Sequence, residues 1–491
     1  TYPNLFNLGA GRTLALVNGR RMVSSASGLG DRVVDTNVIP AGLIKRVEVI
    51  QGGGAAVYGS DAIAGVVNYI LKDDFEGIEV DLQNSVSSRG DDWRPYVRVT
   101  AGSNFAEDRG NIALNFEYSK TNALLDYDRP WTDLSPMLVT NPDDSGPNDG
   151  QPTQIYITHP RYRFHNKNGV LFRPSGSPPF FATFLSQGSQ LFQFSPDGKQ
   201  VIPYDPGVYY GGSASAIGGD GLDWRDVSTM ATGVERYTGT AVGHFDITDN
   251  IRLIGELVYG HQKGTDPYGT QAIFRTLFNS YDGGAGLIRF DRTNPYLTQD
   301  AIDKLDTINP AFAAGDQLFL GRIMDILPSR NRASERDTWR ALVGLEGDFE
   351  AAGRSFYWSL TASRGETSGF IEVGAPHATH LNNALDSTLS GGQIVCRINA
   401  DADPTNDDAA CVPINPFGDV KASPEALAYA TVTSGSRYKN VQDDFLATLG
   451  GELVSLPGGQ AKFSIAYEHR REYAASTPYE ADRLGLTSNC C

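Results

Sequence analysis

The first glycine cluster of the chain has a spacing that could bind phosphate. Gly54 and Gly59 have the separation found in a nucleotide-binding loop, but Ser60 stands where the lysine that reaches the phosphates is required. Gly52 and Gly54 could begin a dinucleotide fingerprint, but the position of its third glycine is Val57. We therefore expect these glycines to serve tight turns and close packing, and no nucleotide cofactor is predicted.

A group of aspartates is the second candidate for chemistry, because hard cations prefer clustered oxygen ligands. The group consists of Asp401, Asp403, Asp407 and Asp408. Its spacing lacks the turn glycine of an EF-hand loop, so calcium remains the alternative to a solvated acidic loop tip. His377 and His380 have a metal-like spacing that is also common in loops without metal. The chain has no His-Glu-x-x-His helix and no nucleophile elbow, so we predict neither a metal nor an enzyme.

Composition limits the class of protein. The chain has 491 residues, with 41 Lys and Arg against 58 Asp and Glu, for a net charge of −17. This balance argues against nucleic acid as a partner, because affinity for phosphate backbones comes from basic residues. Residues 1–76 are neutral, so the entire charge lies beyond them and a domain boundary is predicted near residues 75–77. A run of roughly 18–20 apolar residues, as in a membrane-spanning helix, is absent.

Alternating apolar and polar residues predict nine strands beyond this boundary. They lie at about 78–83, 96–101, 112–119, 237–245, 251–259, 339–349, 356–362, 445–453 and 463–469. Short turns at about 104–110, 246–250, 348–355 and 454–460 alternate with long connections at about 121–232, 261–336 and 366–440. This asymmetry is typical of an outer-membrane barrel, whose alternating strands barely raise the mean hydropathy. A packed soluble sheet remains the alternative.

Aromatic residues support the membrane interpretation. Those near strand ends could form the belts found at membrane interfaces; they are Tyr118, Tyr237, Tyr259, Trp339, Trp358 and Tyr467. The first long connection contains 15 further aromatic residues. They could stack on a flat ligand or sugar, but we expect most of them to form a small core within the loop. Residues 192–202 are predicted to form a hairpin that turns at Asp197-Gly198.

The first 76 residues predict a small α+β domain. Residues 14–17 form a strand that enters a tight turn at Asn18-Gly19, with a return strand at residues 22–23. A short helix could begin at residues 38–43. Two further strands are expected at 45–50 and 66–71.

These segments resemble a known family. Residues 16–21, 44–50 and 52–70 resemble the plug-domain signature of TonB-dependent outer-membrane receptors. Lys45, Gln51 and Gly54-Ala55 depart from the usual pattern without changing the resemblance. The positions that carry the signature are Asn18, Gly19, Arg20, Arg46, Glu48, Gly52, Tyr58, Gly59, Ser60, Ala62, Gly65 and Asn68.

The resemblance implies a fold and a domain organisation. Residues 1–76 would be the C-terminal part of a plug, and residues 77–491 the N-terminal part of a transmembrane antiparallel barrel of roughly 22 strands. Single-chain bacterial barrels normally have an even number of strands, and nine strands would leave two open edges that lipid cannot satisfy, so we expect further strands downstream. The chain begins without Met or a signal peptide, so the energy-coupling TonB box is expected upstream of Thr1.

The resemblance also implies a function in the outer membrane of a Gram-negative bacterium. The expected activity is import of an external siderophore, cobalamin or oligosaccharide, driven by an inner-membrane TonB-type complex. No cofactor is expected, and the other partner is outer-membrane lipid. The alternatives are a passive pore, a ligand-binding or adhesion barrel, and a secreted glycan hydrolase, which would need two carboxylates across a cleft.

Two sets of site residues follow from the resemblance. Arg46 and Glu48 share one face of a strand and resemble a lock that pairs with charges of the barrel wall, for which the candidates are Glu117, Arg252 and Glu256. An ordinary solvated strand face is the alternative. The oxidising compartment also implies that Cys396 and Cys411 form a disulfide inside the third long connection.

Overall fold

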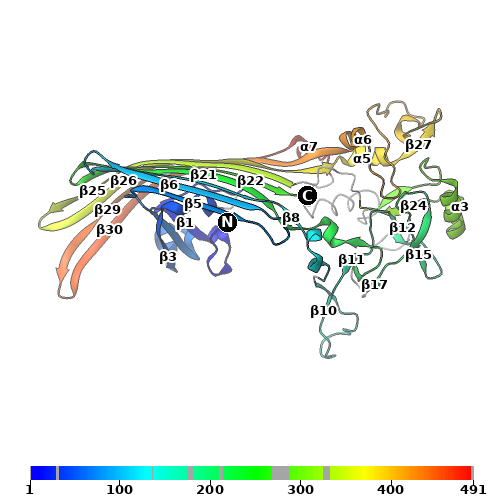
Figure 1. Ribbon diagram of the computed structural model, residues 1–491, viewed down its shortest axis with the longest axis horizontal. Helices are drawn as coiled ribbons and strands as arrows, with labels where there is room; N and C mark the ends of the chain where they lie inside the picture. Colours follow the sequence, from blue (N-terminus) through cyan, green and yellow to red (C-terminus); the bar gives the residue numbers. More distant parts are fainter. Residues whose placement is uncertain are drawn as a thin grey trace.

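A long antiparallel sheet dominates the computed structural model (Figure 1). The structure describes residues 2–28, 32–52, 54–134, 136–174, 182–209, 214–267, 287–323 and 332–487. A small N-terminal domain packs against one face of the long sheet. A body of short strands and helices lies at one end of the long sheet. No helix among these residues is long and apolar enough to cross a membrane, a finding that concerns helices alone.

All nine predicted strands are confirmed, in the predicted order, and each pairs with the next along the chain. The strands are β5 (Gly77–Ser85), β6 (Arg94–Phe105), β7 (Gly110–Thr121), β21 (Gly233–Thr248), β22 (Ile251–Asp266), β25 (Arg332–Ala351), β26 (Arg354–Pro376), β29 (Thr431–Leu456) and β30 (Gly459–Pro478). Strands β5 and β30 are the two edges, so the described strands form an open sheet rather than a closed barrel.

Several strands extend well beyond their predicted ends. Strand β29 has 26 residues, whereas the alternation predicts only 445–453. Its first half, from Thr431 to Asn440, carries mostly polar and small side chains on both faces, so no amphipathic period marks it. It is extended because every residue there pairs with β26, and from Ser436 onward also with β30. The long connections are correspondingly shorter, at 122–232, 267–331 and 377–430.

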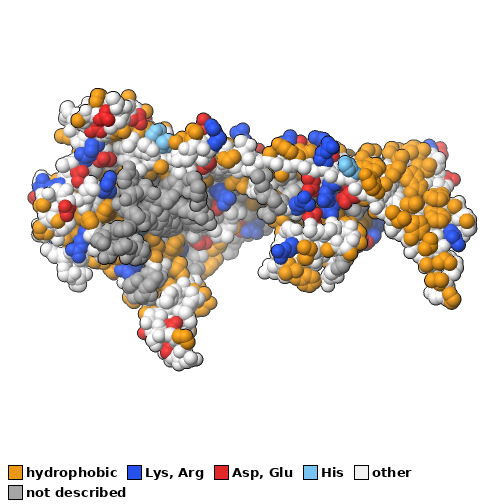
Figure 2. Space-filling view, turned by 180° about the vertical axis from the view of Figure 1, so that it is seen from behind, with side chains coloured by type: hydrophobic (Ala, Val, Ile, Leu, Met, Phe, Trp, Pro, Cys, Tyr) orange, Lys and Arg blue, Asp and Glu red, His pale blue; other side chains and the backbone are white. Residues whose placement is uncertain are grey.

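The two faces of the sheet differ as the pleat requires. On β7, the side chains of Asn111, Asn115 and Glu117 are buried on the face that packs against the small domain. Ile112 and Phe116 on the other face are about half exposed. Figure 2 shows apolar side chains gathered over the part of the sheet near its short turns. An exposed apolar face on a long antiparallel sheet is what the predicted membrane barrel requires on its lipid side.

The N-terminal domain contains a four-stranded sheet of order β2-β1-β4-β3, formed by β1 (Thr13–Val17), β2 (Arg20–Arg21), β3 (Ile44–Gln51) and β4 (Gly65–Leu71). Strand β1 runs parallel to β4. The return strand predicted at residues 22–23 is wrong by two positions, because Asn18 and Gly19 both have positive φ and reverse the chain at once.

Short helical turns connect these strands. They are η1 (Leu5–Asn7), η2 (Ala10–Arg12), η3 (Thr36–Val38), η4 (Ala41–Leu43), α1 (Ala55–Tyr58) and η5 (Ser60–Ala62). The single helix predicted at 38–43 is therefore two separate turns. Pro40 explains the break, because it lacks an amide hydrogen and disfavours helical conformation in the residue before it.

The first long connection is built of many short elements. They are β8 (Leu124–Leu125), η6 (Asp126–Asp128), η7 (Pro130–Leu134), β9 (Met137–Thr140), β10 (Gln154–Ile157), β11 (Pro160–Tyr162), β12 (Val170–Pro174), β13 (Ala182–Phe184), β14 (Ser186–Gln187), β15 (Gln190–Phe194), β16 (Val201–Tyr204), β17 (Val208–Tyr209), β18 (Ser215–Ile217), β19 (Leu222–Asp223), η8 (Trp224–Val227) and β20 (Thr229–Ala231). Strands β15 and β16 pair around Asp197-Gly198, which confirms the predicted hairpin.

The other two long connections and the C-terminal segment contribute helices as well as strands. The second contains β23 (Ile288–Phe290), α3 (Gln299–Ile308), α4 (Pro310–Ala313) and β24 (Leu318–Gly321). The third contains α5 (Ala378–Leu385), β27 (Ser387–Ser390), β28 (Gln393–Cys396), η9 (Arg397–Asn399) and α6 (Pro424–Ala430), and α7 (Glu480–Arg483) follows the last strand.

The three long connections share one hydrophobic core, and we call the body that they form the loop cap. Strand β12 of the first connection pairs with β24 of the second, which aligns Leu171 with Leu320. The buried side chains of the core are Leu171, Leu185, Phe192, Phe194, Ile288, Phe290, Leu297, Leu305, Phe312, Leu318, Leu320, Leu381, Leu385, Ile414, Phe417 and Tyr429. Two smaller clusters contain six further aromatic residues of the first connection, Tyr162, Phe164, Phe172, Phe184, Tyr204 and Trp224. Most of its described aromatic residues are therefore structural, and Phe180, Phe181 and Tyr210 lie outside the described residues.

Candidate functional site

The contact between the N-terminal domain and the long sheet is the candidate functional site. Its centre is apolar, with Val17, Leu43 and Leu71 of the domain in one cluster with Val242 and Val258 of the sheet. Charged and amide side chains surround this centre, and Figure 2 shows the charged ones gathered where the small domain meets the sheet. The contact thus combines an apolar centre with polar groups that each need a hydrogen-bond or ion-pair partner across the contact.

Arg340 on β25 forms the most deeply buried of these polar contacts. Its side chain is 1% exposed and pairs with the carboxylate of Glu256, which is 5% exposed. The same guanidinium donates to the backbone carbonyl of Arg21 at 3.1 Å. Glu256 accepts a second hydrogen bond, at 2.6 Å, from the amide of Asn18. One ion pair of the sheet therefore holds both the turn and the return strand of the β1–β2 hairpin.

A second contact holds the segment that follows this hairpin. Arg336 pairs with Asp35, whose side chain is 1% exposed, and donates to the carbonyl of Ser25 at 3.4 Å. The amide of Asn440 on β29 donates to the carbonyls of Ser24 at 3.1 Å and Ala26 at 2.8 Å. Side chains of two strands, β25 and β29, thus supply hydrogen-bond partners to the backbone of this irregular segment.

A third contact is a network of alternating charges against the edge strand β30. Arg21 lies 2.9 Å from Asp61 and 3.2 Å from Glu468. Arg32 lies 3.2 Å from Glu472, which also pairs with Arg470 at 3.1 Å. The members that come from the domain are therefore Arg21, Arg32 and Asp61.

The three predicted barrel-wall residues all contact the small domain. Glu117 accepts from the amide of Gly42 at 3.3 Å, and Glu256 binds Asn18. Arg252 pairs mainly with Asp246 of its own hairpin, at 2.6 Å, and lies 3.9 Å from Asp73. All three residues therefore contact the small domain, but their partners there are residues that the sequence did not indicate.

Arg46 and Glu48 do not meet any of these wall residues. Their side chains pair with each other at 2.8 Å and are 56% and 45% exposed. The hydrogen bond from Arg46 lowers the pKa of the Glu48 carboxyl, and Asn68 donates to the same carboxylate at 3.2 Å. Strand β3 is the edge of the small sheet and is exposed along its length, so within the described residues neither charge has a partner on the long sheet.

The remaining signature positions build the frame of the domain. Asn18 accepts from the amide of Leu71 and Asn68 accepts from that of Gly19, both at 2.9 Å, so two side chains join the turn to β4. Gly65 has φ of +143°, and a Cβ there would lie 2.4 Å from the carbonyl oxygen of Ile50. Only glycine fits that position.

Other signature positions lie at the turns or at the contact itself. Gly52 and Gly59 have positive φ, and Ser60 and Ala62 begin and end η5. The carbonyl of Tyr58 accepts from Arg21 at 2.6 Å, and Arg20 pairs with Glu346 of β25 at 3.1 Å.

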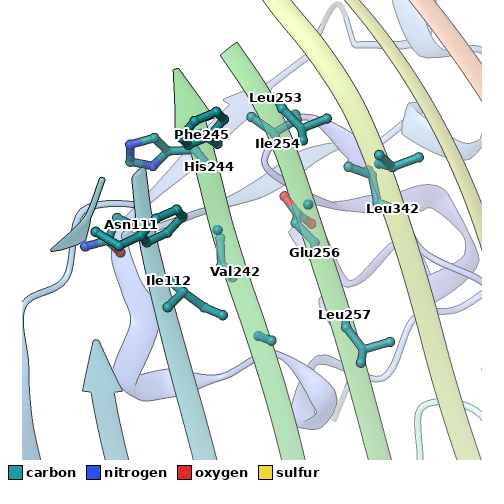
Figure 3. Close-up of a pocket in the computed structure, with 15 residues that line it drawn as sticks. Asn111, Ile112, Val242, His244, Phe245, Leu253, Ile254, Glu256, Leu257 and Leu342 are labelled. Atoms are coloured by element: carbon teal, nitrogen blue, oxygen red, sulfur yellow. The ribbon is translucent and has the colours of Figure 1, made fainter. Parts of the chain in front are cut away.

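The outward face of the sheet carries an apolar hollow of about 430 Å³ (Figure 3). Gly243 and Gly255 are neighbours across β21 and β22, and their missing side chains leave the space between Ile112 and Val343. Among the described residues none of the small domain lines this hollow, although Val242 and Glu256 of the contact just described also line it.

The disulfide between Cys396 and Cys411 is present in the structure, with a sequence separation of 15 residues. Replacing both cysteines by serine should destabilise the loop cap by about 3 kcal/mol, because the bridge restricts the unfolded chain. Thermal unfolding in the presence and absence of a reductant measures this effect. The reductant should lower the Tm of the parent protein and leave that of the double serine variant unchanged. Equal sensitivity of the two proteins would contradict the prediction.

The aspartates between these cysteines accept hydrogen bonds, mostly from backbone amides of their own loop. Asp401 accepts from the backbone of Asp403 at 2.8 Å, and Asp403 accepts from that of Thr405 at 3.0 Å. Asp408 accepts from the hydroxyl of Tyr429 at 2.7 Å, which lowers the pKa of its carboxyl. These bonds are those of turn-forming aspartates, and Asp401 and Asp407 are exposed in the same loop tip. The calcium site therefore stays a prediction from the sequence.

His377 and His380 stack on each other in the loop cap, with ring centroids 3.6 Å apart. Burial and the neighbouring His380 lower the pKa of His377 below its usual value. A lowered pKa in the folded state means that the unfolded chain binds the proton more readily, so this stabilisation is present above about pH 6.5 and lost as the pH falls below it. Hydrogen exchange of α5 and α6 should therefore accelerate between pH 7.5 and 5.5, after correction for the intrinsic rate. His377→Gln should remove this acceleration; its persistence would contradict the assignment.

Comparison with known proteins agrees with the geometry of the small domain. The family model "TonB-dependent Receptor Plug Domain" matches residues 1–66. The chain is 34% identical over 137 residues to a vitamin B12 transporter, BtuB, of Vibrio vulnificus, a match that covers 25% of this chain and 22% of that protein. It is 33% identical over 112 residues to the BtuB of Vibrio cholerae, covering 22% of this chain and 17% of that one. The matches thus span about a fifth of the relatives' length.

Solved structures of two receptors align with almost the whole chain. The ferric enterobactin receptor of Pseudomonas aeruginosa aligns with 96% of this chain and 52% of its own, at 13% identity and a TM-score of 0.35. The ferric citrate transporter FecA aligns with 95% of this chain and 49% of its own, at 10% identity and a TM-score of 0.34. These scores are too low to support any inference about fold or function.

Three observations agree on the family. The small sheet carries the signature residues in structural roles, the family model covers that same segment, and the vitamin B12 transporters are related in sequence. The nine-stranded sheet has the exposed apolar face of an outer-membrane barrel. The chain belongs to the TonB-dependent receptors of the Gram-negative outer membrane.

Proposed function

We propose that the chain binds an external ligand at the loop cap and plug and imports it into the periplasm, with energy from an inner-membrane TonB-type complex. In this proposal residues 1–76 act as the plug and residues 77–491 as the barrel. The observation that carries it is the way the plug is seated. Three separate groups of ion pairs and hydrogen bonds surround a small apolar centre, so the plug can leave the wall by exchanging polar contacts for water.

The ligand belongs to the siderophore, cobalamin or oligosaccharide class. The related proteins named as vitamin B12 transporters favour a large chelate. Trp131 in the first long connection is 55% exposed, and the guanidinium groups of Arg89 and Arg129 lie 5.4 and 5.7 Å from its ring centroid. Arg129 is already paired with Asp91 at 2.7 Å, so the exposed ring beside Arg89 is the part that suits a flat ligand with negative charge.

Ligand uptake by the full receptor, with and without the TonB-type partner, tests this function. Removing the partner should abolish accumulation in the periplasm while leaving binding at the cell surface intact. Uptake that continues without the partner would indicate a passive pore, and surface binding with no uptake in either strain would indicate an adhesion barrel. Ferric siderophores and cyanocobalamin are the first probes, and Trp131→Ala should weaken surface binding of the transported one.

A further inference from the structure

A histidine and two carboxylates converge on the outward face of the sheet, at the end that carries the loop cap. They are His261 on β22 and Asp337 and Glu335 on β25, and their ligand atoms all lie within 4.8 Å of one another. His261 is directly opposite Asp337 in the register, and Nδ1 of its ring is 2.9 Å from Oδ1 of Asp337. Glu335 precedes Asp337 by two residues and therefore lies on the same face.

Among the described residues, neither carboxylate of this group forms an ion pair with lysine or arginine. Glu335 is directly opposite Lys263 in the register, yet the two form no ion pair among the described residues. The only basic side chain that contacts Asp337 in the described part of the chain is His261. Two carboxylates held this close repel each other unless a cation lies between them.

Neighbouring aromatic residues hold two of the three side chains in place. The ring of Tyr237 stacks on His261 with centroids 4.7 Å apart. The hydroxyl of Tyr259 donates to Oδ1 of Asp337 at 2.7 Å. The side chain of His261 is 15% exposed and that of Asp337 is 42% exposed, so the group is fixed on one side and open on the other. A metal site needs this combination of oriented ligands and access.

We propose that His261, Glu335 and Asp337 bind a divalent transition metal such as Zn²⁺. An imidazole nitrogen with two carboxylates suits zinc, copper or nickel, whereas Mg²⁺ and Ca²⁺ prefer oxygen ligands alone. Three protein ligands leave a position for water. Because the ligands come from two paired strands, the metal would cross-link β22 and β25 at the base of the second long connection. The proposal does not depend on the transported ligand.

Zinc titration of the purified receptor, after treatment with a chelator, tests this site. We expect one saturable site that is at least about tenfold weaker in His261→Gln and in Glu335→Gln. His469→Gln is the matched control, because His469 is an exposed histidine of edge strand β30 that lies outside the cluster. Binding of equal strength in the parent and in His261→Gln, or no saturable site in the parent, would overturn the proposal.

A thermal measurement separates the metal site from a merely structural role. Without metal, Glu335→Gln should raise the Tm, because it removes one of two repelling charges. With zinc, the parent protein should gain stability and the variant should not. Zinc binding lost in Glu335→Gln but retained in His261→Gln would show a site of carboxylates alone and would refute the transition-metal assignment.

Discussion

Replacing Glu256 by glutamine should loosen the plug more than any other conservative change in the contact. The substitution keeps the shape of the side chain but leaves the guanidinium of Arg340, which is 1% exposed, without its charged partner. Breaking one side of a buried ion pair costs about 3–5 kcal/mol. Hydrogen exchange of β1 and β4, measured in the receptor embedded in membrane, should accelerate accordingly, and cells should become more sensitive to bulky antibiotics.

Two further variants test the cause. Replacing both partners, with Arg340→Met and Glu256→Leu, should restore much of the protection, because a buried pair of apolar side chains leaves no charge unpaired. Arg364→Ala is the matched control: it removes an ion pair with Asp443 whose side chains are 56% and 45% exposed, a type worth about 0–1 kcal/mol. An effect of Arg364→Ala as large as that of Glu256→Gln would show that the plug responds to any loss of charge in the sheet.

The second expected result concerns the loop cap, which should unfold as one body when Arg322 is replaced by alanine. The guanidinium donates to the carbonyls of Lys167 at 3.2 Å, Asn415 at 2.9 Å and Val420 at 2.8 Å, and its side chain is among the largest that are fully buried. One residue of the second connection thus binds the first and the third. Each carbonyl left without a donor costs about 1–3 kcal/mol.

Hydrogen exchange should therefore increase in all three long connections of Arg322→Ala, whereas the nine long strands should keep their protection. Binding of the external ligand should weaken in parallel, because the cap would no longer present a single surface. Arg292→Ala is the matched control from the same connection, since its ion pair with Asp306 involves a guanidinium that is 44% exposed. Faster exchange confined to the second connection would contradict the shared core.

The strands could be predicted from the sequence, whereas the charged contacts could not. Alternation is a local property with a period of two residues, so it identified nine strands and the lumen-facing parity of Glu117, Arg252 and Glu256. The same parity contains Arg336 and Arg340 of β25, which the prediction missed although two arginines on one face of a strand were a usable signal. The polar half of β29 carried no signal, because long-range pairing alone makes it extended.

The sequence by itself determined the number and order of the nine long strands, the plug signature, and the alternation of short turns and long connections. Each of these depends on residues that are near one another in the chain. The tertiary structure decided which charges meet: Asp35 pairs with Arg336 across 301 residues, and Asn18 binds Glu256 across 238. It also decided that three connections fold around one core. Such partners depend on how the plug docks and how the loops pack, and a local pattern contains no information about either.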